Sequence, residues 1–266
     1  MITGCQACLV DVEGTLIRCK SGAPVDGAVD WLCELHDRGF PTLLVTNSTT
    51  HSSDELAEEL RGLGFRVRAE EILSCLETGS ALLRSYGVRS AMIVGSNRLR
   101  RFFAESGLLI EEHPDVDAVV VGLDLELTYE KLTLPTLALE RNARLVALHE
   151  NPLYRPHDGL PRPGVGAVVR ALEYATGRAA VVAGKPSTYF FRQALQRVGS
   201  APGETIMISD DPLSDLRGAR QVGLRTAFVL SGKYAEPVVL ERLPPGDRPE
   251  EILSSVGEVR FWDERG

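Results

Sequence analysis

Short apolar runs alternate with amphipathic stretches along most of the chain. Strands are predicted where apolar runs lie between turn residues, at 8–12, 41–46, 179–183, 205–209 and 225–230. Helices are predicted where apolar residues recur every three or four positions, near 26–38, 53–62, 187–198 and 213–221. An alternation of strand and helix is typical of a parallel sheet covered by helices. The first prediction is therefore an α/β fold built on a parallel sheet.

A second series of strands and helices occupies the middle of the chain. Its strands are predicted at 91–95, 118–123 and 144–149, and its helices near 98–106 and 129–141. These elements can form a small α/β layer of their own, and the Gly/Pro-rich segment 158–166 suits a return path. We expect residues 76–177 to form an inserted α/β domain. Residues 1–75 and 178–266 are then expected to form the core together.

Composition and charge exclude several classes of protein. The net charge of −8 comes from interspersed acids and bases, which argues against a nucleic-acid-binding surface. No uninterrupted apolar run reaches the roughly 18 residues of a membrane span. The first residues, MITGCQACLVD, lack both the basic region and the long apolar stretch of a signal peptide. We therefore expect a cytoplasmic protein with neither a nucleic-acid nor a membrane partner.

The cysteines do not indicate a disulfide framework. Five of them are an odd number in a long chain. Cys5 and Cys8 have the spacing of half a zinc site, but no second pair follows at ligand spacing. We interpret these two as small residues that lead into the first strand.

Polar side chains collect where the predicted core strands end. The first strand ends in Asp11-Val12-Glu13-Gly14-Thr15, the second in Thr46-Asn47-Ser48, and the fourth in Ser209-Asp210-Asp211, with Asp215 in the following turn. Lys185 stands just before the helix near 187–198. In an open parallel sheet, ligands bind beyond the carboxyl ends of the strands. The sequence therefore predicts one crevice that gathers acids, hydroxyls, an amide and an ammonium group.

These residue types suit phosphoryl transfer. Clustered carboxylates repel one another, and Mg²⁺ relieves this repulsion with one or two carboxylates, phosphate oxygens and waters as its ligands. An Asp carboxylate can attack phosphorus to give a phospho-aspartyl intermediate. Lys185, Thr46 and the amides at the start of the next helix can hold phosphoryl oxygens. We therefore expect Mg²⁺ as the cofactor.

The order of four short motifs resembles that of the haloacid dehalogenase superfamily. That family has D-x-D-G-T, then a Thr or Ser, then a Lys, then an acidic G-D-x-x-x-D, and this chain has DVEGT, VTNST, GKP and SDDPLSD. The resemblance implies a Rossmann-like core with the large α/β cap of subclass IIA, which includes nitrophenyl phosphatases. ALEYATGRAAVVAGKPSTYFF and MISDDPLSDLRGARQVG look closer still to the phospholysine phosphohistidine inorganic pyrophosphate phosphatase branch.

The resemblance implies a role for each acidic residue of the motifs. Asp11 corresponds to the nucleophile, which is also a metal ligand. Glu13 corresponds to the residue that shuttles the leaving-group proton and offers its backbone carbonyl to the metal. Asp210 corresponds to the metal-binding Asp of the fourth motif. Asp215, or else Asp211, would act on the metal directly or through water.

The resemblance also implies residues that contact the substrate. The phosphate-binding residues would be Thr46, Asn47, Ser48 and Lys185, and Lys185 would neutralise charge during catalysis. The cap loop from 149 to 155 is expected to reach the leaving group, with a solvated turn as the alternative. Its candidate substrate contacts are His149, Tyr154 and Arg155.

Two residues depart from the family pattern. Glu13 stands where the family has Asp and is longer by about 1.5 Å, and a misplacement of roughly 1 Å can cost on the order of a hundredfold in rate. Glu13 can still serve as acid and base, as the similar D-x-E-G-T motif of enolase-phosphatases suggests, can serve only good leaving groups, or can be unable to act. Ser209 replaces the usual Gly, a milder departure, and a side chain there could crowd the metal loop.

Two functions follow as expectations. The first is a Mg²⁺-dependent phosphoric monoester hydrolase that acts on a small phosphorylated metabolite, a phosphoamino acid or pyrophosphate through phospho-Asp11. The alternative is a weak or inactive family member that binds metal and phosphate in a regulatory role because of Glu13. Caps of this family often pair, so a homodimer is one expected assembly, and the oligomeric state stays open.

Overall fold

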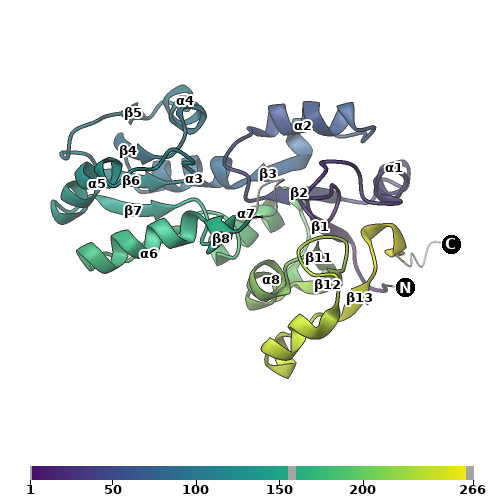
Figure 1. Ribbon diagram of the computed structural model, residues 1–266. Coiled ribbons are helices and arrows are strands. Elements are labelled where there is room, and N and C mark those ends of the chain that lie inside the picture. The colour runs from purple at the N-terminus through teal and green to yellow at the C-terminus, as the bar shows by residue number, and fades with distance from the viewer. Residues whose placement is uncertain (1, 155–159, 262–266) are drawn as a thin grey trace.

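Two parallel β-sheets form the framework of the protein, one in the core and one in the cap (Figure 1). The computed structural model describes residues 2–154 and 160–261. The core sheet has the strand order β13-β12-β11-β1-β2-β3, and all its neighbours pair in parallel. Its strands are β1 (Ala7–Asp11), β2 (Thr42–Thr46), β3 (Ile72–Ser74), β11 (Thr205–Ser209), β12 (Arg225–Val229) and β13 (Glu251–Leu253). The predicted α/β fold with a Rossmann-like core is confirmed.

Helices cover both faces of the core sheet, so its central strands are mostly apolar and almost entirely buried. On one face pack α1 (Ala28–Asp37) and α2 (Ser53–Gly62), which contribute Trp31 and Leu60 to the buried cluster there. On the other pack α7 (Thr188–Val198), the short π-helix η3 (Pro212–Leu216) and α8 (Arg217–Gln221), where Phe190 and Phe191 are fully buried. This packing explains the continuous apolar runs of the strands.

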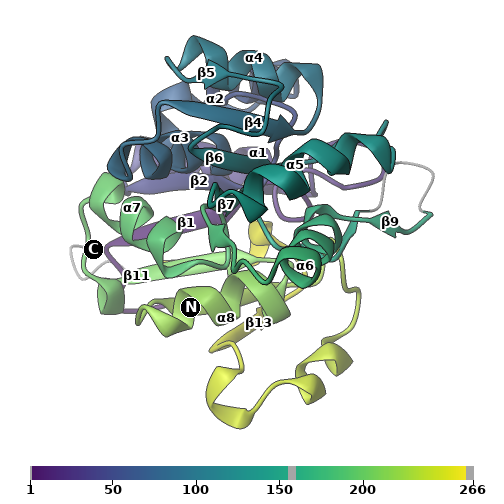
Figure 2. The same cartoon turned by 90° about the vertical axis from the view of Figure 1, so that its left-hand side faces the viewer.

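The cap sheet is also parallel and has the strand order β10-β7-β6-β4-β5. Its strands are β4 (Ser90–Val94), β5 (Leu109–Ile110), β6 (Ala118–Val121), β7 (Arg144–Ala147) and β10 (Val181–Val182). Helices α3 (Cys75–Ser85) and α4 (Asn97–Glu105) pack on one face, and α5 (Glu130–Glu140) and α6 (Val165–Thr176) lie side by side on the other (Figure 2). A small hairpin, β8 (Leu153–Tyr154) and β9 (Arg162–Pro163), follows β7.

One predicted strand belongs to the other sheet. We expected the strand at 179–183 in the core, and this placement was wrong, because Val181 and Val182 pair with Val146 and Ala147 of β7 at the edge of the cap sheet. An apolar run predicts a strand but does not show which strand it pairs with. Here α6 brings the chain back beside β7. Helices α3 and α6 were also missing from the prediction. The division of the chain into 1–75, 76–177 and 178–266 stays a prediction.

The cap and the core meet where the chain passes between them. The amide of Gly184 donates to the carbonyl of Leu148 at 2.8 Å. A Cβ atom at Gly184 would lie 2.4 Å from that carbonyl oxygen and 2.7 Å from Cys75 Cβ, so no larger residue fits there without displacement. A second link runs from the Leu123 amide to Thr49 Oγ1 at 3.3 Å. The cap therefore lies close to the carboxyl ends of the core strands.

Short helices complete the described chain. The 3₁₀ helices are η1 (Ala69–Glu71), η2 (Pro202–Glu204), η4 (Pro237–Arg242), η5 (Pro245–Asp247) and η6 (Val256–Glu258). Within residues 2–154 and 160–261, no helix combines the length and the apolar character that a membrane crossing needs. The five cysteines are all free thiols.

Candidate active site

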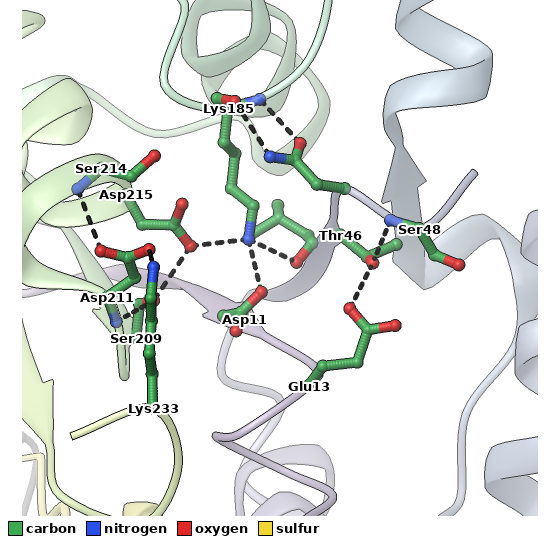
Figure 3. A network of polar contacts seen from close by, with 12 residues as sticks. Asp11, Glu13, Thr46, Ser48, Lys185, Ser209, Asp211, Ser214, Asp215 and Lys233 are labelled. Atoms are coloured by element: carbon green, nitrogen blue, oxygen red, sulfur yellow. Dashed lines mark hydrogen bonds and ion pairs between the residues drawn. The ribbon is translucent and has the colours of Figure 1, made fainter. Parts of the chain in front are cut away.

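Three neighbouring strands bring the predicted motifs together. β11, β1 and β2 lie side by side in the core sheet, so Ser209, Asp11 and Thr46 end at the same edge (Figure 3). Lys185 enters from the loop before α7, and Asp215 from η3. The structure therefore places the four motifs of the sequence in one cluster, as the strand-end rule predicts.

Lys185 is the centre of this cluster. Its side chain is only 2% exposed, and its Nζ donates to Asp11 Oδ1, to Asp215 Oδ2 at 2.7 Å and to the Val45 carbonyl at 3.3 Å. Burial by itself would lower the pKa of Lys185, but the carboxylates of Asp11 and Asp215 outweigh it and raise the pKa above its usual value. Lys185 is therefore a permanent cation between two acids.

The side chain of Asn47 holds the backbone of Lys185. Asn47 Nδ2 donates to the Lys185 carbonyl, and the Lys185 amide donates to Asn47 Oδ1, both at 2.9 Å. A Cβ atom at Gly184 would lie 2.5 Å from Asn47 Oδ1, so the glycine leaves room for this pair. The amide of Asn47 thus positions Lys185, and a phosphate contact from Asn47 would come from its backbone.

Ser209 links the acids of the fourth motif. Its hydroxyl donates to Asp215 Oδ2 at 2.9 Å and accepts from the Asp211 amide at 3.1 Å. The Ser209 side chain is fully buried inside this network. Crowding of the metal loop by Ser209 stays a prediction. The Ser209 hydroxyl therefore links the Asp211 backbone to the Asp215 carboxylate, and a glycine at this position would lack both hydrogen bonds.

The two candidates for the last acid of the motif have different surroundings. Asp211 caps η3, since its Oδ1 accepts from the amides of Leu213 at 3.2 Å and Ser214 at 3.1 Å. Its other oxygen accepts from Lys233 Nζ at 2.7 Å. Asp215 instead faces Lys185 directly. Asp211 therefore has a helix-capping role, and Asp215 belongs to the charged cluster.

Asp210 lies against the first motif. Its carboxylate is 5% exposed, and burial raises its pKa to about 7. A Cβ atom at Gly14 would lie 2.0 Å from Asp210 Oδ2, and the φ of Gly14 is +89°, so only glycine allows this approach. Asp210 is thereby brought next to the backbone that follows Glu13.

The acids of the site fit a divalent cation in an open arrangement. Burial raises the pKa of Asp11, Lys185 lowers it, and the charges of Asp215 and Asp210 raise it again, so the acids repel one another. Among the described residues, no three acidic, histidine or cysteine side chains are arranged to hold a metal ion. Mg²⁺ needs only one or two carboxylates beside waters and phosphate oxygens. Asp11 and Asp210 supply two such carboxylates. Asp11 and Asp215 both pair with Lys185, and the same Asp215 oxygen also accepts from Ser209.

Glu13 lies at the exposed rim of the cluster. Its Oε2 accepts from Thr46 Oγ1 at 3.4 Å, and that hydroxyl accepts from the Ser48 amide at 2.9 Å. The surrounding protein raises the pKa of Glu13 by desolvation, and Lys185 opposes the rise. Glu13 thus contacts the motif that is expected to bind phosphate.

The substrate contacts expected of His149, Tyr154 and Arg155 stay predictions. His149 follows β7 and is buried, and its Nδ1 accepts from the Asn151 amide at 3.2 Å. Burial, with the charge of Lys185, lowers the pKa of His149 to about 4, so this ring is neutral near pH 7 and cannot offer a positive charge to an anion. Tyr154 ends β8, while Arg155 lies outside the described residues.

Sequence reasoning missed one part of the site. Ser231, Gly232 and Lys233 follow β12, and the Lys233 amide donates to Asp210 Oδ2 at 2.5 Å. The signal was available, because polar residues after a core strand are the feature that selected the other motifs.

Comparison with known proteins shows the family of the chain. Residues 8–109 match the family model described as haloacid dehalogenase-like hydrolase, and residues 182–259 match one described as HAD-hydrolase-like. Haloacid dehalogenase-like hydrolase domain-containing protein 2 of Rattus norvegicus is 38% identical over 230 residues, which cover 86% of this chain and 85% of that protein. An acid sugar phosphatase of Staphylococcus epidermidis is 29% identical over 261 residues, which cover 96% and 98%.

Solved structures resemble the whole described fold. NagD of E. coli K-12 superposes with a TM-score of 0.85 at 25% identity and covers 96% of this chain and 98% of its own. A glycerol phosphate phosphatase of Mycobacterium tuberculosis in complex with magnesium has a TM-score of 0.82 at 30% identity and covers 94% and 74%. The finer resemblance to the phospholysine phosphohistidine inorganic pyrophosphate phosphatase branch stays a prediction. The chain therefore belongs to the haloacid dehalogenase-like hydrolase family and stands among its phosphatases.

Proposed function

We propose that the protein is a Mg²⁺-dependent phosphoric monoester hydrolase that works through a phospho-aspartyl intermediate on Asp11. The observation that carries the proposal is the position of Lys185 Nζ between Asp11 and Asp215, at the edge where Asp210 also lies. The acid sugar phosphatase and the magnesium-bound glycerol phosphate phosphatase, which the chain resembles, support it.

The metal would be held by few protein groups. Asp11, Asp210 and the backbone carbonyl of Glu13 would contact Mg²⁺, with waters and phosphate oxygens completing its shell. When bound, Mg²⁺ neutralises charge on the phosphoryl group and orients it. Asp215 would influence the metal site indirectly, through its contacts with Lys185 and Ser209.

The side chains can perform both halves of the reaction. An Asp11 oxygen would attack phosphorus, so that an O–P bond forms while the bond from phosphorus to the leaving oxygen breaks. Glu13 would give its proton to that oxygen, then take one from the water that attacks phospho-Asp11 and releases phosphate. Lys185, Thr46 and the backbone at Ser48 would hold the phosphoryl oxygens.

Glu13 decides between the two functions. Burial raises the pKa of Glu13 above its usual value, and this direction suits a group that donates a proton, which favours the hydrolase. Its contact with Thr46 favours the alternative, a regulatory protein that binds metal and phosphate without turnover, because the carboxylate lies at the expected phosphate site. We favour the hydrolase, since the proteins that the chain resembles include an acid sugar phosphatase and a glycerol phosphate phosphatase.

The substrate would be a small phosphorylated metabolite, a phosphoamino acid or pyrophosphate. The cap loop lies beyond β7, and His149 can offer a neutral hydrogen bond there. Contacts of Tyr154 and Arg155 with the substrate, a homodimer and a cytoplasmic location stay predictions.

Phosphate release from p-nitrophenyl phosphate tests the proposal. The wild type should release phosphate with Mg²⁺ and lose this activity in EDTA. Asp11→Asn should abolish release while circular dichroism shows an unchanged fold. Binding of Mg²⁺ and phosphate by a wild type that releases none above background would instead favour the regulatory protein. A panel of phosphorylated metabolites, phosphoamino acids and pyrophosphate would then identify the substrate.

A further inference from the structure

A loop outside the four motifs borders the acidic cluster. Ser231, Gly232 and Lys233, called here the 231–233 loop, follow β12, the neighbour of β11 in the core sheet. The Lys233 amide donates to Asp210 Oδ2 at 2.5 Å, and the Ser231 hydroxyl donates to the Gly14 carbonyl at 2.7 Å. The loop is thus bonded to an expected metal-binding carboxylate and to the backbone just after Glu13.

Gly232 makes this approach possible. A Cβ atom there would lie 2.0 Å from Asp210 Oδ2 and 2.5 Å from Gly14 Cα. The φ of Gly232 is outside the left-handed region, so the backbone accepts alanine and only the contact excludes it. Gly14 and Gly232 therefore leave room for the same carboxylate oxygen.

The side chain of Lys233 makes a separate contact. Its Nζ pairs with Asp211 Oδ2 at 2.7 Å, and the side chain is 43% exposed. Asp211 in turn caps η3. The side chain thus fastens the loop to η3, while the backbone amide of the same residue holds Asp210.

We propose that the 231–233 loop positions Asp210 and the Glu13–Gly14 backbone for a divalent cation. Its essential parts are the Lys233 amide on Asp210, the space at Gly232 and the Ser231 hydroxyl on the Gly14 carbonyl. A hydrogen bond to Oδ2 sets the orientation of the whole Asp210 carboxylate, and such outer partners of metal ligands change metal affinity by about 10- to 100-fold. The inference rests on the proposed function in taking Mg²⁺ as the cation, and it makes these three residues positioning residues.

Mg²⁺ binding by the full chain tests the loop without using turnover. The measurement is the Mg²⁺ concentration that gives half of the maximal rise in the thermal unfolding midpoint, because a ligand of the folded state stabilises it. Gly232→Ala should need at least about tenfold more Mg²⁺. Lys233→Met keeps the backbone amide on Asp210 but loses the side-chain contact with Asp211, so it should need a smaller increase in Mg²⁺ than Gly232→Ala. Gly203→Ala is the matched control, since a Cβ atom there meets nothing within 4 Å.

Each outcome separates the loop from the proposed function. A folded Gly232→Ala with wild-type Mg²⁺ dependence overturns the inference, and so does a Lys233→Met loss as large as that of Gly232→Ala. If Gly232→Ala does not fold, Ser231→Ala decides, and an unchanged Mg²⁺ dependence overturns the inference. A wild type without any Mg²⁺ response contradicts both proposals. A Mg²⁺ response that Gly232→Ala weakens, without phosphate release by wild type, supports the loop and contradicts the hydrolase.

Discussion

The side-chain amide of Asn47 makes two hydrogen bonds of 2.9 Å with the backbone of Lys185, one as donor and one as acceptor. The pair joins residues 138 positions apart in the chain. It fixes the start of the Lys185 side chain, whose far end lies between two carboxylates. The second motif therefore holds the third in position through these two hydrogen bonds. The contact gives the Asn47 side chain a role in positioning Lys185 rather than in binding phosphate.

Asn47→Ala should lower kcat rather than raise KM. Loss of both bonds lets Lys185 move, and a misplacement of about 1 Å costs on the order of a hundredfold in rate. Asn47→Asp keeps the acceptor for the Lys185 amide and should lose less activity. Steady-state kinetics with p-nitrophenyl phosphate measures the split. A large rise in KM with unchanged kcat would show instead that Asn47 binds the phosphate.

Lys185→Met should abolish activity and destabilise the fold. It leaves Asp11 and Asp215 buried without their cation, which typically costs about 3–5 kcal/mol of unfolding free energy. Urea denaturation without Mg²⁺ measures this change. The control is Arg141→Met, which breaks the exposed pair with Asp115 and should cost less than about 1 kcal/mol. Equal losses in the two variants would contradict the central role of Lys185.

Glu13→Asp should favour substrates with poor leaving groups. Asp is shorter by about 1.5 Å, which restores the family's reach, and proton transfer contributes roughly 10²–10⁴-fold only where the leaving oxygen needs a proton. We expect the rate on an alkyl phosphate to rise at least about tenfold relative to p-nitrophenyl phosphate. Glu13→Gln keeps the length of the side chain and removes its acidic proton. Its rate on the alkyl phosphate should therefore fall more than its rate on p-nitrophenyl phosphate. Wild-type rates of Glu13→Gln on both substrates would show that Glu13 transfers no proton.

His149 should make the protein less stable in mild acid. Its pKa is lowered from 6.5 to about 4, so the unfolded chain binds more protons in that window. Stability is then complete above about pH 6.5 and is lost as the pH falls towards 4, by an amount on the order of 3 kcal/mol.

His149→Asn tests this pH dependence, since Asn can still accept from the Asn151 amide. Urea denaturation of wild type and variant from pH 7 to 4 gives the difference. The variant should lose less stability than wild type across this range. Parallel curves would mean that His149 is not the buried group responsible.

The sequence by itself determined the class of fold and the edge of the sheet where the candidate site residues gather. Apolar runs bounded by turn residues locate core strands such as β1 and β11, because strands buried on both faces must be apolar throughout. Polar residues at their ends, such as Asp11 and Asp210, locate the site, because the carboxyl ends of parallel neighbours share one edge. Both inferences need only local patterns and the order of elements.

Only the tertiary structure decided which groups touch. The pairing of β10 with β7, the hold of Asn47 on Lys185 and the hold of the 231–233 loop on Asp210 join segments far apart in the chain. Their partners depend on distances of a few ångströms, which follow from how sheets and helices pack in three dimensions. An apolar run or an amide side chain has the same local pattern whichever partner it meets.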